Sequence, residues 1–195
     1  MFLHWVLALL VPVQIGLGWY MLSIEDQPGS GWYFALHISL GLTAALLIAL
    51  RLMWRLRQAP PMLPAAVPAW QAKAARISHP LIYLLMLLMP LTGYLGASFG
   101  GEATSYFGLP LPNWSPKNEA LKEQLFTTHS LIAWVLVALV ALHVLGAFKH
   151  LLIDKDTVFR RMWPREGAQT PQFASPSQTY KCNLEGQTDA KKRSP

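Results

Sequence analysis

Four long stretches of the chain contain no charged side chain. Residues 1–24, 27–50, 77–101 and 124–148 hold no Asp, Glu, Lys or Arg, so the 16 basic and 10 acidic residues all fall in the rest of the 195-residue sequence. A helix crosses the apolar core of a bilayer, about 30 Å thick, in roughly 20 residues. The pattern therefore predicts four membrane-spanning helices, which form an all-α integral membrane four-helix bundle.

The segments between these stretches contain residues that interrupt helices. A polar turn is expected at 26–31, and prolines at positions 60, 61, 64 and 68 break any helix there. Residues 108–116 contain three prolines and are expected to form a non-helical loop. The first stretch lacks the basic region and small-residue cleavage site of a signal peptide, so we expect a retained helix.

Basic residues near the helix ends predict the orientation, because cytoplasmic loops are enriched in Lys and Arg. Ten basic residues flank the second connection and the end of the fourth stretch, whereas the first and third connections together carry only Lys117 and Lys122. Both termini are therefore expected in the cytoplasm. Aromatic side chains suited to the interface lie near the expected outer ends: Trp19, Tyr20, Trp32, Tyr33, Tyr106 and Trp114.

Composition excludes several other classes of protein. The sequence is 53% apolar and 13% charged, and its net charge of +6 belongs to loops and tail, which argues against a soluble nucleic-acid-binding domain. The single cysteine, Cys182, cannot form an internal disulfide. Residues 1–165 are predicted to form the membrane domain, and the polar composition of residues 166–195 predicts a disordered tail.

Five of the six histidines fall within the charge-free stretches, where an unpartnered imidazole is costly. His37 and His129 lie near the expected outer ends of the second and fourth helices. His4, His79 and His143 lie toward the inner ends of the first, third and fourth helices. His129 and His143 are 14 residues apart, so one helix offers ligands on similar faces at two depths, about 21 Å apart. Any one of these histidines could simply form a hydrogen bond between helices. Histidines at two matched depths on several helices are not explained in that way, and they indicate ligand sites.

The ligand set favours haem over zinc. Zinc usually takes four ligands, and no carboxylate lies in these stretches to complete its coordination. A low-spin haem needs two axial ligands in an apolar cavity, and a covalent c-type haem is excluded because Cys-x-x-Cys-His is absent. Gly41 and Gly146 would leave space for a macrocycle, although helix packing explains small residues equally well.

These residues resemble the bacterial cytochrome b561 family over about residues 2–164. The likeness rests on His4-Trp5, on Leu36-His37-Ile38-Ser39-Leu40-Gly41, on His79-Pro80 with Pro90 and Gly93, on the paired His129 and His143, and on the closing motif Arg160-Arg161-Met162-Trp163-Pro164. The resemblance implies a four-helix protein of the bacterial inner membrane. It also implies two non-covalent haem b groups and electron transfer from a small-molecule or protein donor to a quinone such as ubiquinone.

The resemblance also implies roles for individual residues. His37 and His129 would hold the outer haem, and His4 and His143 the inner haem. His79 precedes a proline at an expected helix start, so a role as a helix cap or a haem propionate contact is expected rather than ligation. Arg51 and Arg55 are candidates for pairing with propionates, but the topology rule alone would also place basic residues there.

The donor and the type of reaction are less constrained. Because some members of the family are superoxide-to-ubiquinone oxidoreductases, Lys117 and Lys122 are candidate residues for attracting superoxide toward the outer haem. Two alternatives remain: an electron-transfer subunit of a hydrogenase or other dehydrogenase, and a haem-free transporter that uses histidines for metal or protons. The lack of an intramembrane carboxylate argues against the transporter.

Overall fold

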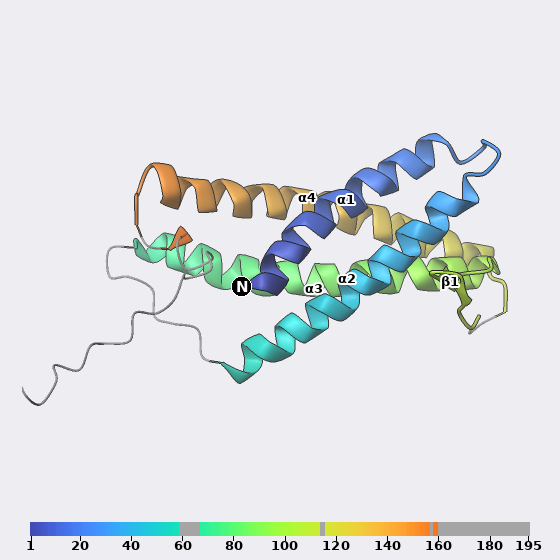
Figure 1. Ribbon diagram of the computed structural model, residues 1–195, viewed down its shortest axis with the longest axis horizontal. Helices are drawn as coiled ribbons and strands as arrows, with labels where there is room; N and C mark the ends of the chain where they lie inside the picture. Colours follow the sequence, from blue (N-terminus) through green and yellow to red (C-terminus); the bar gives the residue numbers. More distant parts are fainter. Residues whose placement is uncertain (59–66, 114–115, 157, 160–195) are drawn as a thin grey trace, which may run out of the picture. The chain divides into compact units, whose positions relative to one another are not determined.

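The computed structural model describes residues 1–58, 67–113, 116–156 and 158–159. Four long helices dominate this part of the chain (Figure 1): α1 (Phe2–Ser23), α2 (Gly31–Arg57), α3 (Ala69–Gly100) and α4 (Glu119–Leu152). Each is long and apolar enough to cross a membrane. The prediction of four such helices is confirmed.

The helices are longer than the charge-free stretches that predicted them. α2 continues to Arg57, α4 begins at Glu119 and ends at Leu152, and α3 begins at Ala69, directly after Pro68. Charged residues are therefore part of the helix ends, where they can reach the headgroup region or water. Prolines 12, 80 and 90 lie within helices, which membrane helices tolerate when neighbouring groups satisfy the freed backbone carbonyls.

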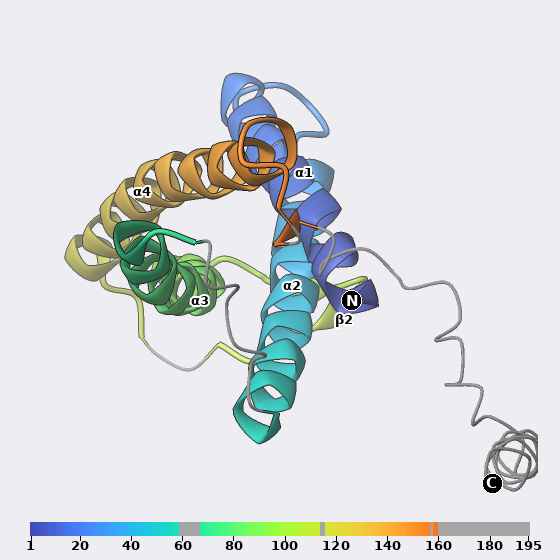
Figure 2. The ribbon, with the colours of Figure 1, turned by 90° about the vertical axis from the view of Figure 1, so that its left-hand side faces the viewer.

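The helices alternate in direction and pack in sequence. α1 packs against α2, α2 against α3, and α3 against α4, and Figures 1 and 2 show α1 beside α2 and α3 beside α4. The α1–α2 turn and the α3–α4 connection lie at the same end of the helices in Figure 1. This arrangement is the one that the four stretches predict.

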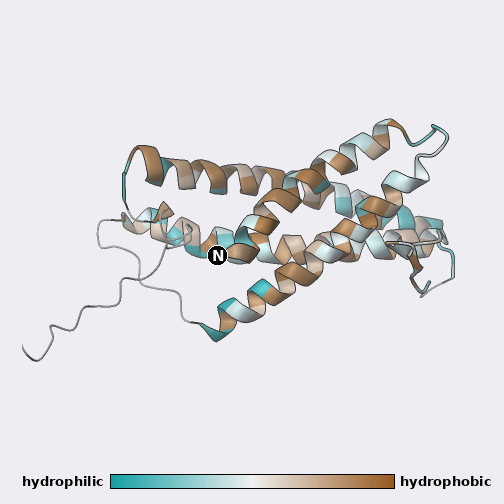
Figure 3. Ribbon diagram, in the orientation of Figure 1, coloured by the Kyte–Doolittle hydropathy of each residue, from teal (hydrophilic) through white to brown (hydrophobic). Residues whose placement is uncertain are grey.

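Residues of high hydropathy extend along all four helices (Figure 3). Leu9, Leu46 and Leu142 are among many large apolar residues that are exposed, as expected for side chains that face lipid. A small buried cluster joins three helices: Leu7 of α1 and Ala44 and Ile48 of α2, against Tyr83, Met86 and Leu87 of α3.

The α3–α4 connection contains a short antiparallel hairpin, β1 (Ser105–Tyr106) and β2 (Leu109–Pro110), which adds two strands to the predicted all-α fold. Gly108 has φ +88°, which suits its place between the strands. The buried Ser39 of α2 anchors the hairpin, because its hydroxyl accepts a hydrogen bond from the Phe107 N–H at 2.9 Å. The hairpin is therefore attached to α2 at Ser39, which is two positions after His37 in the sequence.

Both ends of this connection are capped. Gly101, with φ +70°, ends α3 in the left-handed conformation that favours glycine. The Asn118 side chain accepts a hydrogen bond from the Leu121 N–H at the start of α4. Of the interface aromatics, Tyr20 and Tyr33 meet across the α1–α2 turn with ring centroids 5.2 Å apart.

Some sequence predictions fall outside the described residues. These are Trp114, the prolines at 60, 61 and 64, the closing motif at 160–164, and the tail 166–195 with Cys182.

Candidate functional site: two histidine groups

The rings of His37 in α2 and His129 in α4 lie close together, toward the end of the helices that is predicted to be outer. Their ring centroids are 6.3 Å apart, and the ring planes are inclined by 73°. The two residues are 92 positions apart in the chain, so packing of the helices brings them together. The predicted outer pair is therefore a pair in space.

Helix α3 supports the ring of His129. The Nδ1 atom of His129 lies 2.9 Å from the carbonyl oxygen of Met89 and 3.2 Å from the hydroxyl oxygen of Thr92, both in α3. A Cβ atom at Gly93 would lie only 3.1 Å from Cε1 of the ring. The missing side chain at Gly93 lets the imidazole approach α3, and the two oxygen atoms then hold it there.

His37 has different surroundings. Its Nδ1 is buried and has no hydrogen-bond partner among the described residues. A Cβ at Gly18 would lie 3.3 Å from its Cε1 atom, and Gln14 donates a hydrogen bond to its backbone carbonyl at 3.0 Å. Helix α1 therefore fixes the backbone of His37 and leaves room for its ring.

The inner group contains three histidines. The ring centroid of His143 in α4 lies 6.4 Å from that of His4 in α1 and 5.1 Å from that of His79 in α3. The structure therefore brings together both candidates for the partner of His143.

The prediction that His79 lies at a helix start is wrong. α3 begins ten residues earlier, at Ala69, and the Nδ1–H of His79 donates to the carbonyl of Ala75 at 2.6 Å within the helix. The charge-free stretch begins only at residue 77 because Lys73 and Arg76 precede it, although both lie in the first turns of α3.

Arg51 and Arg55 lie beside this inner group. The Nε–H of Arg51 donates to the hydroxyl of Tyr83 at 2.8 Å, and the guanidinium of Arg55 lies 5.4 Å from the centre of the same ring. Tyr83 is one turn beyond His79 in α3. The two arginines therefore place positive charge near His79.

Lys117 and Lys122 lie at the opposite end of the helices. Lys122 forms ion pairs with Glu102 at 3.5 Å and Glu119 at 3.7 Å. The side chain of Lys117 lies against Gly101. Much of the charge of Lys122 is thus balanced by the acidic residues of the same segment.

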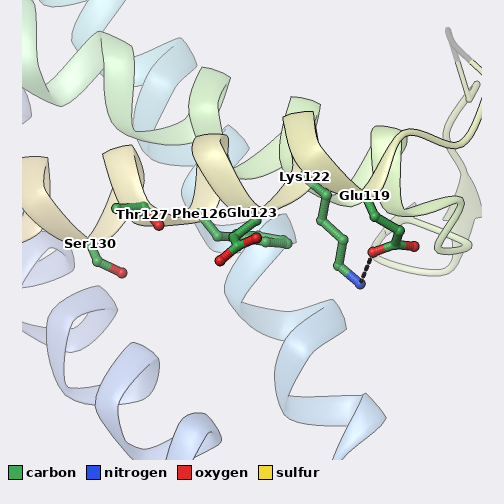
Figure 4. Close-up of a pocket in the computed structure, with 6 residues that line it drawn as sticks. All are labelled: Glu119, Lys122, Glu123, Phe126, Thr127 and Ser130. Atoms are coloured by element: carbon green, nitrogen blue, oxygen red, sulfur yellow. Dashed lines mark ion pairs between the residues drawn. The ribbon is translucent and has the colours of Figure 1, made fainter.

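Lys122 also lines a surface pocket on one side of α4 (Figure 4). The lining residues follow one helix face toward the neighbourhood of His129: Glu119, Lys122, Glu123, Phe126, Thr127 and Ser130. A Cβ at Gly96 would lie 3.1 Å from the ring of Phe126, so this ring packs closely on α3.

Two further sequence expectations concern glycines. A Cβ at Gly41 would meet the Gln14 amide at 3.0 Å, so this glycine serves helix packing, whereas no atom of the described residues lies within 4 Å of a Cβ at Gly146. The sixth histidine, His150, lies near the end of α4, where its side chain is only 15% exposed and its Nδ1 lies 2.6 Å from a carboxylate oxygen of Asp156. Nearby, a hydrogen bond from Lys149 holds the pKa of Asp154 below its ordinary value.

The outer pair fits a group that takes two axial ligands. Metal–nitrogen bonds of about 2 Å on each side, with each ring centre about 1 Å farther out, place axial imidazole centroids roughly 6 Å apart. The centroid distances of 6.3 Å for His37 and His129 and 6.4 Å for His4 and His143 agree with this value. The distance of 5.1 Å between His79 and His143 is shorter.

Sequence reasoning missed several supporting residues. Gln14, Gly18, Met89 and Thr92 were not assigned to a site, and Gly93 appeared only as part of a motif. Their roles depend on contacts between helices, and the Met89 contact uses a backbone carbonyl, which any residue type provides. A glycine or threonine that lies opposite a histidine on a neighbouring helix would indicate such a supporting role. A single sequence does not show which residues lie opposite one another.

Comparisons with known proteins confirm the family resemblance found in the sequence. The family described as prokaryotic cytochrome b561 matches residues 1–165. Cytochrome b561 homolog 2 of Escherichia coli (strain K12) is 32% identical over 164 residues, which cover 82% of this chain and 86% of that protein. Cytochrome b561 homolog 1 of the same strain is 29% identical over 171 residues, covering 84% and 94%.

A further relative carries a more specific name. The probable superoxide oxidase CybB of Yersinia pestis is 29% identical over 171 residues, which cover 84% of this chain and 93% of that protein. Since the family match extends over most of the sequence and includes all four helices, the chain belongs to the prokaryotic cytochrome b561 family, whose members are haem b-binding membrane proteins of electron transport.

Proposed function

We propose that this chain is a dihaem cytochrome b of the bacterial inner membrane that transfers electrons from a donor at the outer face to ubiquinone. The observation that carries the proposal is the presence of two histidine pairs at two depths, with nearly equal centroid distances of 6.3 and 6.4 Å. In this proposal, His37 and His129 hold the outer group and His4 and His143 the inner group. Bound haem b supplies reversible one-electron transfer between ferric and ferrous iron.

The histidines determine what kind of chemistry is available. If two imidazoles held each haem, its iron would have no coordination position left for a small molecule, and the haem would supply outer-sphere electron transfer. α4 contributes one histidine to each pair, and 14 residues of continuous helix separate them by about 21 Å along its axis. A single helix thereby sets the spacing between the outer and inner positions.

Residues around the inner pair suit anionic groups. Arg51 uses its Nε–H for Tyr83, and its terminal nitrogens have the geometry for a carboxylate. Arg55 lies against the same tyrosine ring. We assign Arg51 and Arg55 to the propionates of the inner haem, with His79 as a neighbouring propionate contact rather than an axial ligand.

Superoxide is the proposed donor. The support is the name of the Yersinia relative and the position of Lys117 and Lys122 at the outer end. In the net reaction, two superoxide anions are oxidised to dioxygen, and their two electrons, with two protons, reduce one quinone to quinol. The ion pairs of Lys122 with Glu102 and Glu119 limit its attraction for an anion, so we expect Lys117 to have the larger effect.

The reaction is tested by stopped-flow reduction of the purified protein with superoxide, with and without a short-chain ubiquinone. We expect fast reduction, reoxidation by the quinone, and slower reduction in a Lys117→Gln/Lys122→Gln variant. Lys73→Gln at the opposite end is the matched control and should leave the rate unchanged. If superoxide reduces the protein slowly and at the same rate in the Lys117→Gln/Lys122→Gln variant, while a membrane dehydrogenase reduces it quickly, the alternative is favoured. The chain would then be a subunit that receives its electrons from a dehydrogenase.

A further inference from the structure

The contacts between α3 and His129 have a consequence for the outer haem. We propose that Thr92, together with the backbone carbonyl of Met89, is a positioning element that fixes the tautomer of His129 and lowers the reduction potential of the outer haem. This inference rests on the proposed function, because it assumes that His129 is an axial ligand. It adds a residue whose side chain would not touch the haem itself.

The tautomer follows from the chemistry of the partners. A carbonyl oxygen only accepts hydrogen bonds, so the 2.9 Å contact between Nδ1 of His129 and the Met89 oxygen requires a proton on Nδ1. The Thr92 hydroxyl lies 3.0 Å from the Leu88 carbonyl and 2.9 Å from the Met89 carbonyl, to which it donates within its own helix. Its oxygen therefore accepts from His129 at 3.2 Å. The lone pair of the imidazole is left on Nε2, the nitrogen that can bind a metal.

The local sequence of α3 makes this support possible. Thr92 is only 9% exposed, so water competes little for its hydroxyl. At Gly93 a Cβ would lie 3.2 Å from Nδ1 of His129, a distance at which the ring would have to move. Threonine and glycine at adjacent positions thus supply a hydrogen-bond acceptor and the space for the ring to reach it.

The outer pair is asymmetric as a result. Nδ1 of His37 is buried without a partner in the described part of the chain, whereas Nδ1 of His129 has two oxygen neighbours. An acceptor on the distal N–H makes an imidazole a stronger donor to its metal. A stronger axial donor stabilises ferric iron and lowers the potential, so α3 adjusts the outer haem through His129 alone.

The substitution Thr92→Val tests this step. A methyl group needs more room than an oxygen at 3.2 Å, so valine removes one acceptor and also moves the ring away from the Met89 carbonyl. Thr92→Ser keeps the hydroxyl. Thr128→Val is the matched control, because Thr128 is adjacent to His129 in sequence but its exposed hydroxyl donates to the Gln124 carbonyl of its own helix.

The measurement is a spectroelectrochemical titration of both haems in the purified full chain, with electron paramagnetic resonance of the ferric forms. We expect Thr92→Val to raise the potential of one haem and change its resonance, with the second haem unchanged, and Thr92→Ser and Thr128→Val to match the natural sequence. Gly93→Ala should raise the same potential, because its Cβ displaces the ring.

The possible outcomes separate this inference from the proposed function. Unchanged potentials in both Thr92→Val and Gly93→Ala, with both haems retained, would overturn the role of Thr92. If Thr92→Val loses the haem, retention and an unchanged potential in Thr92→Ser support the inference, whereas loss in Thr92→Ser overturns it. Absence of haem from the unsubstituted chain would instead refute the proposed function.

Discussion

Each intramembrane histidine has its own set of neighbours, and these neighbours define what its ring can do. His129 is held by oxygen atoms of α3, His37 has a buried Nδ1 without a partner among the described residues, and the ring of His143 lies close to those of both His4 and His79. Substitutions at these positions should therefore have different effects.

His129→Ala should remove the outer haem and His143→Ala the inner haem, because each change leaves one axial position without its ligand. About half of the haem absorbance should be lost in each variant. His79→Ala serves as the matched control and should retain both haems. Loss of a haem from His79→Ala, with retention in His4→Ala, would show that His79 is the inner ligand.

The sequence allowed the outer histidine pair to be predicted from residue type and depth, and the family resemblance implied His4 as the partner of His143, but the residues that support these histidines could not be predicted. His37 and His129 could be paired because both lie near the outer ends of their helices. Thr92 and Gly93 could not be assigned, because their role depends on packing between α3 and α4 that places both residues against His129. His79 was misplaced at a helix start because charge marks where a span leaves the apolar core, and the helix itself continues beyond that point.

Among the elements, α3 shows how a membrane helix combines breaking residues with a continuous backbone. It spans Ala69–Gly100 despite Pro80 and Pro90, and it contacts both α2 and α4. Its length was underestimated from the sequence for the same reason as the position of His79. The hairpin 105–110 was not predicted, and only its second half fell within the expected non-helical loop 108–116, because two-residue strands leave no alternating pattern to detect.

The C-terminal segment 166–195 is expected to be separable from the helices, because its composition offers little apolar area to bury. Deletion of residues 166–195 should leave haem content and the melting temperature of the purified protein nearly unchanged. Thermal unfolding followed by haem absorbance measures both. A clearly lower melting temperature, or loss of haem, would show that the segment is docked on the membrane domain.

At the scale of the whole molecule, the proposed orientation places both termini in the cytoplasm. The evidence is the concentration of basic residues at one end of the helices. The length of the apolar helices and their exposed apolar side chains support insertion in a membrane.

The single cysteine offers a direct test of orientation. In intact spheroplasts, Cys182 should resist a membrane-impermeant maleimide and should react after permeabilisation, because the tail would lie inside the cell. The matched control is Gln27→Cys in a Cys182→Ser background, which places the thiol in the exposed α1–α2 turn and should react without permeabilisation. The opposite labelling pattern would reverse the orientation and the assignment of outer and inner histidines.

The central claim is that one chain holds two haem b groups between two histidine pairs. Its most direct test is the pyridine haemochrome spectrum of the purified protein, quantified against protein concentration. The account predicts a b-type spectrum and a ratio near two haems per chain. A ratio near zero or one, or a c-type spectrum, would contradict it.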